Sequence, residues 1–409
     1  MAEYTSLLVL GVYVLLGAWL RSWRGLGHDI LMACLNITVA YGVFFAGGDP
    51  RFALVYLMMV IGQYLAMRWW SEREGAIPWV AFLLPIFLLV AVRYVPPHAL
   101  AGLSAGLRTK LEADPRYGWG AHFVGISYLA FRSSHLVLEV RNRIVPKPGF
   151  WTYLTFVFFV PTFSVGPITP YSVYRRGLTD DLRSELPVGR SLLRVLVGAV
   201  KCQFLAPLLN QFTYGELLLD GRGHSWVELP IAIVAYYLFL YANFSGFCDI
   251  AVGAGGLMGV PVAENFDNPF AARNVKAFWN RWHITLSLWM RDVVFSPISK
   301  VLVRVLGPAR AHHAIALTIL LVFLLVGIWH GAGWNYAAFG LMHALGVIAN
   351  HYYTLGLKRW LGKDRFAAYN RSRWIQAAAV VSTFLYVAAS LCLFANNGKA
   401  MQELLATLR

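Results

Sequence analysis

The feature that most constrains this chain is a series of long apolar runs separated by short clusters of charged residues. The clearest run extends from Ala314 to Trp329 and contains no charged side chain. A helix needs about 20 largely apolar residues to cross the hydrocarbon core of a bilayer. Backbone polar groups in lipid must find their hydrogen bonds within the helix itself. The runs therefore predict a chain that crosses a membrane repeatedly as helices.

Ten segments have the length and hydropathy of a membrane span, and two further segments are weaker candidates. We expect an all-α, polytopic integral membrane protein with roughly 9–12 transmembrane helices, accompanied by interfacial and re-entrant helices. The strong candidates are 5–20, 29–46, 52–67, 77–93, 149–166, 191–209, 226–243, 314–330, 334–350 and 375–394, and the weaker ones are 119–138 and 245–260.

Composition excludes a soluble protein. Hydrophobic residues make up 58% of the 409 residues and charged residues only 13%, whereas a soluble domain carries about 25% charged residues. Polar stretches at 94–118, 171–190 and 262–276 contain proline, glycine and mixed charge, and we expect short helices along the membrane interface there. With no linker, repeat or low-complexity tract, the sequence predicts one membrane-embedded domain over 1–409.

The net charge of +15 does not indicate a nucleic-acid-binding protein. Nucleic-acid recognition needs a basic stripe on a soluble face, and here the basic residues flank apolar runs, as Arg21 and Arg24 do. Such residues are typical of cytoplasmic loops that face anionic lipid. The positive-inside rule therefore places the loop of Arg21 and Arg24 in the cytoplasm and the N-terminus outside.

The residues that commonly bind metals do not form a recognisable site. The four cysteines are far apart, each in an apolar setting, so neither a disulfide framework nor a zinc ribbon fits. His312 and His313 are adjacent and would point apart on a helix, and no His-Glu-x-x-His sequence occurs. We expect no metal and no tightly bound cofactor.

The stretch 265–295 has helical amphipathy. Its polar residues recur at spacings of three or four and would share one helix face; they are Lys276, Asn280, His283, Ser287 and Arg291. One polar stripe would then carry a histidine. The alternative is an interfacial helix whose polar face is merely wet. Arg291 beside Asp292 is interpreted as a local ion pair.

A second histidine, His330, ends the uncharged run and precedes Gly331 and Gly333. Histidine has the side-chain pKa nearest physiological pH, so a neutral imidazole at membrane depth can accept a proton. The glycines would let the backbone leave the helix and a substrate come near. The alternative is a core histidine that is hydrogen-bonded to a carbonyl group.

Together the two stretches resemble the membrane-bound O-acyltransferase family. One element is Trp279-Asn280-Arg281-Trp282-His283, and the other, 47 residues later, is Trp329-His330-Gly331. Further similar elements bring the motif-bearing core to about 119–350; they are Gly125-Ile126-Ser127-Tyr128, Ser164-Val165-Gly166-Pro167-Ile168, Phe244-Ser245-Gly246-Phe247 with Asp249, and Asn265-Phe266 to Pro269-Phe270.

Within the family the chain is similar to the bacterial glycan-modifying branch, which includes the teichoic-acid D-alanyltransferase and the alginate and peptidoglycan O-acetyltransferases. The string from Pro161 to Ile168 is more like the D-alanyl type, and Val262-Ala263-Glu264-Asn265-Phe266 is more like the alginate type. The acyl group, D-alanyl or acetyl, is left open.

The resemblance implies roles for individual residues. His330 would be the catalytic general base and His283 would assist it, both in a central pocket within the bilayer, while the residues supporting the pocket would be Trp329, Asn280, Arg281, Trp282 and Ser287. No Gly-x-Ser-x-Gly sequence occurs, so direct transfer without an acyl-serine intermediate is favoured.

The resemblance also implies partners. The co-substrate would be an acyl thioester on an acyl carrier protein or coenzyme A, presented at the cytoplasmic side of a bacterial cytoplasmic membrane. The acceptor would be an extracytoplasmic glycan or an accessory transferase protein.

Two alternatives to glycan acylation remain at this point. A transporter or flippase of a glycan or lipid intermediate could use His330 as a proton relay. An acyltransferase acting on lipid or protein would have the same histidines. His343 and His351 are interpreted as residues of a span and a loop, without a catalytic role.

Overall fold

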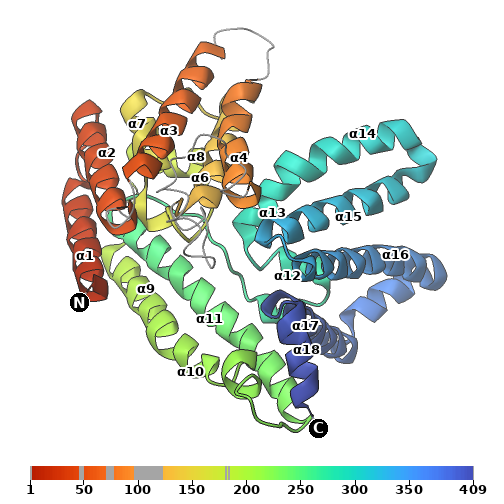
Figure 1. The fold of residues 1–409 in the computed structure, drawn as a ribbon. Coiled ribbons are helices and arrows are strands. Elements are labelled where there is room, and N and C mark those ends of the chain that lie inside the picture. Colours follow the sequence, from red (N-terminus) through yellow and green to blue (C-terminus); the bar gives the residue numbers. More distant parts are fainter. Residues whose placement is uncertain are drawn as a thin grey trace. The chain divides into compact units, whose positions relative to one another are not determined.

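The computed structural model describes residues 2–45, 50–70, 78–95, 123–179, 182 and 185–408. Within these ranges the chain is helical, and extended pairing is limited to two isolated bridges (Figure 1). This confirms the all-α prediction. The chain divides into two compact units: the first comprises 1–197 and 247–263, and the second comprises 198–246 and 264–409. Whether the protein folds as a single domain stays a prediction.

The first unit contains the N-terminal helices and the end of a long helix, α11 (Glu228–Leu257), that the two units share. Its other helices are α1 (Ala2–Leu20), α2 (Leu26–Ala40) with the π-helix η1 (Tyr41–Phe45), α3 (Pro50–Trp70), α4 (Trp79–Tyr94), α6 (Ile126–Arg141), α7 (Phe150–Val157), α8 (Tyr171–Thr179) and α9 (Val188–Val200).

Several charged side chains of the first unit have structural partners. The buried Arg132 donates to Thr162 Oγ1 and to the Val157 carbonyl oxygen, both at 2.6 Å. The Glu139 carboxylate accepts from the first two backbone N–H groups of α8, where it also balances the positive end of the helix dipole. The ion pair from Arg194 to Asp249 links α9 to α11 at 2.9 Å. These side chains stabilise the fold of this unit.

The second unit contains both candidate histidines. It begins with the π-helix η5 (Lys201–Leu205), α10 (Ala206–Asn210), the π-helix η6 (Tyr214–Leu218) and the first part of α11. The helices that follow are α12 (Val275–Trp279), α13 (Ile284–Met290), the π-helix η8 (Arg291–Phe295), α14 (Ser296–Leu306), α15 (Ala311–His330), α16 (Trp334–Arg371), α17 (Arg373–Ala395) and α18 (Gly398–Thr407).

Close packing of α15 on α16 depends on two glycines. A Cβ atom on Gly327 would overlap the Tyr336 carbonyl, and one on Gly340 would overlap the Phe323 carbonyl. Small residues at such crossings let helix backbones approach closely, which is the common basis of helix association in membranes. The pair of glycines therefore sets how His330, at the end of α15, lies against α16.

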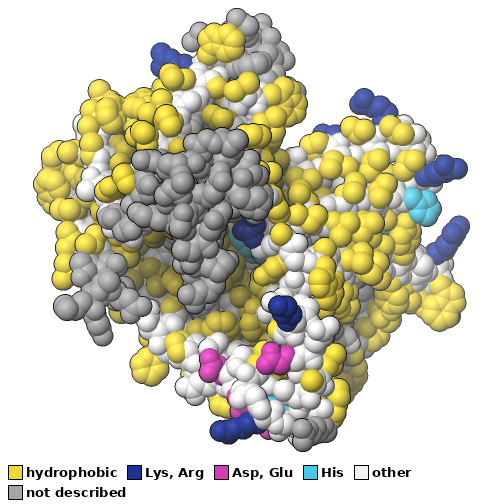
Figure 2. All heavy atoms as spheres, in the orientation of Figure 1, with side chains coloured by type: hydrophobic (Ala, Val, Ile, Leu, Met, Phe, Trp, Pro, Cys, Tyr) yellow, Lys and Arg dark blue, Asp and Glu magenta, His cyan; other side chains and the backbone are white. Residues whose placement is uncertain are grey.

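Six helical segments among the described residues are long and apolar enough to cross a membrane; they are Leu26–Phe45, Phe52–Trp69, Val188–Leu218, Glu228–Leu257, Pro308–His330 and Arg373–Ala395. Two shorter apolar helices, Leu8–Leu20 and Trp79–Tyr94, accompany them. Large apolar side chains are exposed along them, for example Phe204 at 78% and Leu193 at 60%. Figure 2 shows apolar side chains over most of the visible face. This surface suits lipid, and the protein is a multi-pass membrane protein.

Some predicted elements differ from the structure. The expected span over 149–166 is wrong as a continuous helix, because α7 ends at Val157 and a 3₁₀ turn follows at Val160–Thr162. Pro161 lacks the N–H that a continuing helix would need. The segment 334–350 is helical, as the first part of α16, and its crossing of the membrane stays a prediction. Most of the polar stretch 94–118 lies outside the described residues.

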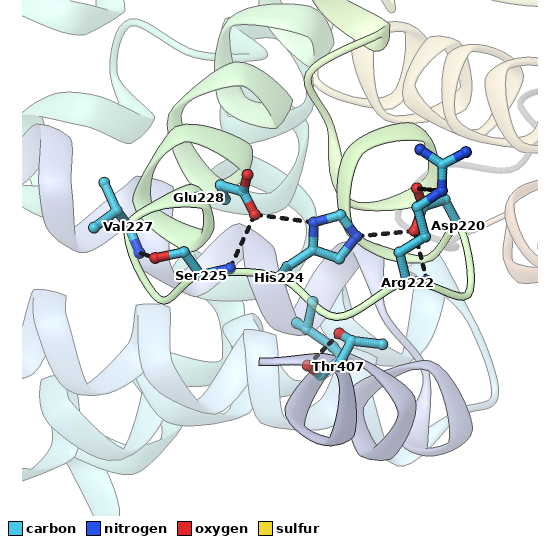
Figure 3. Close-up of polar contacts among 8 residues, drawn as sticks. Asp220, Arg222, His224, Ser225, Val227, Glu228 and Thr407 are labelled. Carbon is cyan, nitrogen blue, oxygen red and sulfur yellow. Dashed lines mark hydrogen bonds and ion pairs between the residues drawn. The ribbon is translucent and has the colours of Figure 1, made fainter. Parts of the chain in front are cut away.

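The loop before α11 and the end of α18 are joined by a histidine between two carboxylates. His224 Nε2 lies 2.8 Å from Asp220, and Nδ1 lies 2.9 Å from Glu228 (Figure 3). The backbone N–H of His224 donates to the Thr407 carbonyl at 2.8 Å. We call the side chains of Asp220, His224 and Glu228 the histidine clasp. It fixes the loop in the conformation in which the His224 backbone bonds to the end of the C-terminal helix.

Candidate active site

The segment that carries His283 is not one helix. α12 ends at Trp279, α13 begins at Ile284, and His283 between them has a left-handed backbone with φ 46°. The expectation of a single amphipathic helix over this stretch is therefore wrong. Left-handed conformations are unfavourable for residues other than glycine and are concentrated at functional sites.

Backbone pairing explains the break. Asn265–Asp267 runs antiparallel to the segment before α13: the Asp267 N–H donates to the Arg281 carbonyl and the Ile284 N–H to the Asn265 carbonyl, both at 3.0 Å. Phe266 and Trp282 form the bridge between these bonds. Hydrogen bonds that a helix would have made locally are thus made with a segment 14 to 19 residues away in the sequence.

Asn265 orients the His283 ring. Its Oδ1 accepts from the Thr285 backbone N–H at 3.1 Å and from the Thr285 hydroxyl at 2.7 Å, and it lies 3.4 Å from His283 Nδ1. Because Oδ1 can only accept, the His283 proton belongs on Nδ1, and the lone pair is on Nε2. Burial, followed by the charge of His330, lowers the pKa of His283 to about 3. His283 is therefore a neutral acceptor at physiological pH.

His330 lies in a half-buried aromatic setting at the end of α15. Its ring centroid is 4.5 Å from that of Trp329, 4.9 Å from Phe394 and 6.1 Å from Phe339. A Cβ atom on Gly331 would overlap the Tyr336 ring, so a larger residue after the histidine would have to displace that ring.

One hydrophobic cluster joins the surroundings of the two histidines. Phe339 and Trp282 are both buried in it, and Phe266 and Phe394 pack against it. His283 adds an edge contact to Phe244, with ring centroids 4.8 Å apart. The histidines therefore lie at the border of the same aromatic core, and electrostatic coupling between them is consistent with this arrangement.

A cavity of about 880 Å³ lies in the second unit among α12, α13, η8, α15 and α16. Its inner wall is apolar and includes Val326, Phe323 and Trp279. Its polar lining includes Lys276, Asn280, Ser287, Arg291 and His351. Such a cavity suits an elongated ligand with an apolar part and a polar or anionic part.

The predicted polar stripe is divided between two environments. Lys276, Asn280, Ser287 and Arg291 line the cavity, whereas His283 points into the buried aromatic core and is not part of the cavity lining. Arg291 pairs with Asp292 at 2.8 Å, which confirms the predicted ion pair.

The other predicted support residues have distinct positions. Trp282 is 7% exposed and packs on Phe266 and Phe278. Arg281 is partly exposed and reaches the carbonyl oxygens at the Asp267 turn, so its contacts are structural. Trp329 lies beside His330. The roles assigned to these side chains in acyl transfer stay predictions.

The sequence model of the membrane-bound O-acyltransferase family matches residues 15–392, almost the whole chain. The chain is a membrane-bound O-acyltransferase. The aligned region contains both histidines of the site, and the match extends beyond the motif-bearing core predicted at about 119–350. Because members of this family are acyltransferases, the protein is an enzyme, and the transporter alternative is set aside.

The acyltransferase is similar to three kinds of glycan-modifying protein. It is 29% identical to a teichoic acid D-alanyltransferase of Streptococcus thermophilus over 84% of this chain and 81% of the relative. It is 30% identical to a peptidoglycan O-acetyltransferase of Helicobacter pylori, over 52% of this chain and 39% of the relative. It is 26% identical to a probable alginate O-acetylase of Pseudomonas aeruginosa, over 66% and 48%.

Two buried residues near the candidate histidines have contacts that the sequence does not predict. Asn265 belongs to a family-like motif, but its contact with His283 depends on antiparallel pairing that periodicity does not reveal. His343 was interpreted as an ordinary residue of a span, yet it is completely buried in the acyltransferase and both its ring nitrogens are hydrogen-bonded. A histidine in an otherwise apolar helix was the available signal.

Proposed function

We propose that the protein transfers a short acyl group, D-alanyl or acetyl, from a thioester donor on the cytoplasmic side to a hydroxyl group of an extracytoplasmic glycan, with His330 as the general base. The observation that carries this proposal is the placement of His283 and His330 at the border of one aromatic core in a member of the family. We place the protein in the cytoplasmic membrane of a bacterium.

The reaction needs one proton acceptor and no acyl-enzyme. His330 takes the proton of the acceptor hydroxyl as that oxygen attacks the thioester carbonyl. The carbon–sulfur bond then breaks, and the thiolate leaves with the proton that the His330 imidazolium returns. The overall change is thioester plus alcohol to ester plus thiol. The half-buried ring of His330 meets this requirement, since it combines access with a partly desolvated setting.

His283 has a supporting role in this proposal. Its lone pair on Nε2 can accept a hydrogen bond from the acceptor hydroxyl or from a neighbouring sugar hydroxyl and so orient the attacking oxygen. With its pKa lowered to about 3 by burial, the ring does not compete for the proton that His330 carries. Two imidazoles with different environments are then suited to two different tasks.

The cavity of the second unit supports a thioester donor, although His330 is not part of its lining: the lining reaches Val326, one helical turn before His330 on α15. Carrier proteins and coenzyme A both present their acyl group on a long, flexible arm that carries phosphate. Lys276 at the cavity lining offers a positive charge to the phosphate, and the apolar inner wall suits the remainder of the arm. We propose an acyl carrier protein or acyl-coenzyme A as the donor partner.

The relatives favour a glycan acceptor. Their names specify teichoic acid, peptidoglycan and alginate. The D-alanyl relative matches most of its own length, whereas the chain spans about half or less of the two O-acetyl relatives. D-Alanyl transfer is therefore the first reaction to test, with the product passing to the glycan directly or through an accessory transferase protein.

The test uses the purified full-length protein in lipid nanodiscs. Two labelled donors, D-alanyl carrier protein and acetyl-coenzyme A, are each combined with teichoic acid, peptidoglycan fragments or alginate. Esterified product is measured by mass spectrometry, and released thiol is measured in the same samples. We expect one donor to give a glycan ester and His330→Ala to abolish it. Full transfer by folded His330→Ala protein would show that His330 is not the general base. Esterification of lipid or protein alone would show that the acceptor is not a glycan.

A further inference from the structure

His343 on α16 is a buried histidine that the proposed reaction does not use. Trp279 Nε1–H donates to its Nδ1 at 3.1 Å, and its Nε2 lies 2.9 Å from Ser390 Oγ. Because an indole N–H can only donate, Nδ1 is the acceptor, and the neutral ring donates to Ser390 from Nε2. The Ser390 hydroxyl in turn donates to the Val387 carbonyl at 2.7 Å. The ring is therefore fixed in one tautomer and one orientation.

The network joins three separate elements. Trp279 ends α12, His343 lies in the first third of α16, and Ser390 lies near the end of α17. Aromatic rings close around the imidazole: Phe339 is 4.5 Å away and Trp279 is 5.2 Å away, centroid to centroid. His343 itself is 0% exposed. Hydrogen bonds in such a dry setting are strong, and losing one partner leaves a buried polar group unsatisfied.

Two members of the network, Ser390 and His343, each lie four residues, about one helical turn, from an aromatic residue that packs on His330. Four residues after Ser390, Phe394 packs on His330 with centroids 4.9 Å apart. On helices, residues four apart lie on the same face.

The same spacing occurs on α16, where Phe339, four residues before His343, contacts both the His343 ring and the His330 ring. Trp279 is linked to His283 differently, because α12 ends at Trp279 and only the turn 280–282 separates the two residues. A displacement of the network would therefore move both histidines of the site.

We propose that His343 is a positioning residue, whose hydrogen bonds to Trp279 and Ser390 hold α12 and α17 against α16 and thereby align His283 with His330. This inference rests on the proposed function, in which these two histidines act on the reactants. His343 does not touch substrate, because both its nitrogens are already engaged. Its contribution is geometric.

The test compares variants that keep or remove the two hydrogen bonds. His343→Phe keeps an aromatic ring and removes both bonds, whereas His343→Gln retains one acceptor and one donor. Ser390→Ala removes only the second bond. Thr383→Val is the matched control: it lies on the same helix, is buried, and loses a hydroxyl that bonds only to the Ala379 carbonyl.

Each variant is assayed in nanodiscs for kcat, for KM of the donor and for the thermal unfolding midpoint. A misplacement of about 1 Å costs about 100-fold in rate, so we expect His343→Phe to lower kcat by about that factor with KM changed less than about twofold. His343→Gln should recover kcat to within about tenfold of the wild type. Thr383→Val should keep the wild-type kcat.

Several results would overturn the proposal: wild-type kcat in His343→Phe, a loss confined to KM, no recovery by His343→Gln, or an equal loss of kcat in Thr383→Val. If His343→Phe does not fold, Ser390→Ala decides by the same criteria, with a smaller expected loss of kcat. Thiol release from the donor reports the chemistry even if no glycan accepts the acyl group. His330→Ala, measured alongside, tests the base separately, so that failure of the proposed function is distinguished from failure of the positioning role.

Discussion

At the scale of single residues, the two candidate histidines are held by different means. His283 is held through an amide and an unusual backbone conformation, and His330 is packed among aromatic rings. The polar character of His283 suggested a wet helix face, but its ring is buried. The polarity of His283 therefore did not predict that its ring is buried, because the polar partner of the ring is Asn265, which comes from another segment of the chain.

The substitution Asn265→Ala tests how much the side-chain amide of Asn265 contributes to stability. We expect the substitution to lower the free energy of unfolding by about 1–3 kcal/mol, because the Thr285 N–H and hydroxyl lose their buried acceptor. The loss is measured as a lower thermal unfolding midpoint in detergent. Asn370→Ala, at an exposed side chain on α16, is the control and should leave the midpoint unchanged. An equal midpoint in both variants would contradict the argument.

At the scale of elements, sequence periodicity predicted helices correctly in apolar runs that no proline interrupts and whose hydrogen bonds are local. The apolar runs at 314–330 and 375–394 correspond closely to α15 and α17. Periodicity gave the wrong structure at 265–295. The polar residues do recur at helical spacing there, but the segment before α13 pairs with Asn265–Asp267 instead of continuing the helix. Long-range backbone pairing leaves no periodic signal in the sequence, so the division of the polar stripe could not be foreseen.

The contact between α15 and α16 gives a prediction with an internal control. Gly340→Ala places a Cβ atom against the Phe323 carbonyl, so we expect a lower unfolding midpoint and reduced acyl transfer. Gly356→Ala lies on the same helix with no atom within 4 Å of the new Cβ. Alanine is favoured over glycine within a helix by about 1 kcal/mol, so this variant should be neutral or slightly stabilised. A similar loss in both variants would refute the role of close packing.

The histidine clasp gives a prediction about pH. The hydrogen bond to Asp220 raises the pKa of His224, and the hydrogen bond to His224 lowers the pKa of Asp220. A raised pKa means that the contribution of His224 to stability is fully present below its ordinary value of 6.5 and is lost as the pH rises through the folded value. The contribution of Asp220 is present above 3.8 and is lost as the pH falls.

We therefore expect the clasp to stabilise the attachment of α18 most between these two values and to weaken at alkaline pH. Hydrogen exchange of Gly398–Thr407, followed by mass spectrometry after correction for the intrinsic pH dependence of exchange, should show weaker protection at pH 9 than at pH 6. His224→Gln should remove most of that difference. A pH dependence that is unchanged in His224→Gln would assign it to other groups.

At the scale of the whole molecule, composition and apolar runs predicted the class of protein, and two short motifs predicted the family. What they could not give is the set of contacts within the second unit, since the network of Trp279, His343 and Ser390 joins positions up to 111 residues apart in the sequence. The orientation in the membrane is also a property of the whole chain, and the basic residues Arg21 and Arg24 predict that their loop faces the cytoplasm. Contacts of Arg21 within the first unit extend this prediction to other loops of the chain.

Arg21 is the reference point for orientation. Its guanidinium donates to the Leu186 carbonyl at 2.8 Å, and its side chain lies against Gly259. Leu186 precedes the span Val188–Leu218 and Gly259 follows the span Glu228–Leu257. If Arg21 faces the cytoplasm, as its basic loop indicates, the connection between these two spans must face the opposite side of the membrane.

Single-cysteine labelling checks this orientation. In a background with the four native cysteines replaced, Ser22→Cys and Arg222→Cys each place one thiol at an exposed position of these two connections. A membrane-impermeant maleimide applied to intact cells should label Arg222→Cys at once, whereas Ser22→Cys should react only after the membrane is permeabilised. Both variants should label equally in detergent, which controls for intrinsic reactivity. The reverse pattern in intact cells would show that the orientation is opposite to the one that the basic loop predicts. Equal labelling of the two variants in intact cells would show that one of the two spans does not cross the membrane.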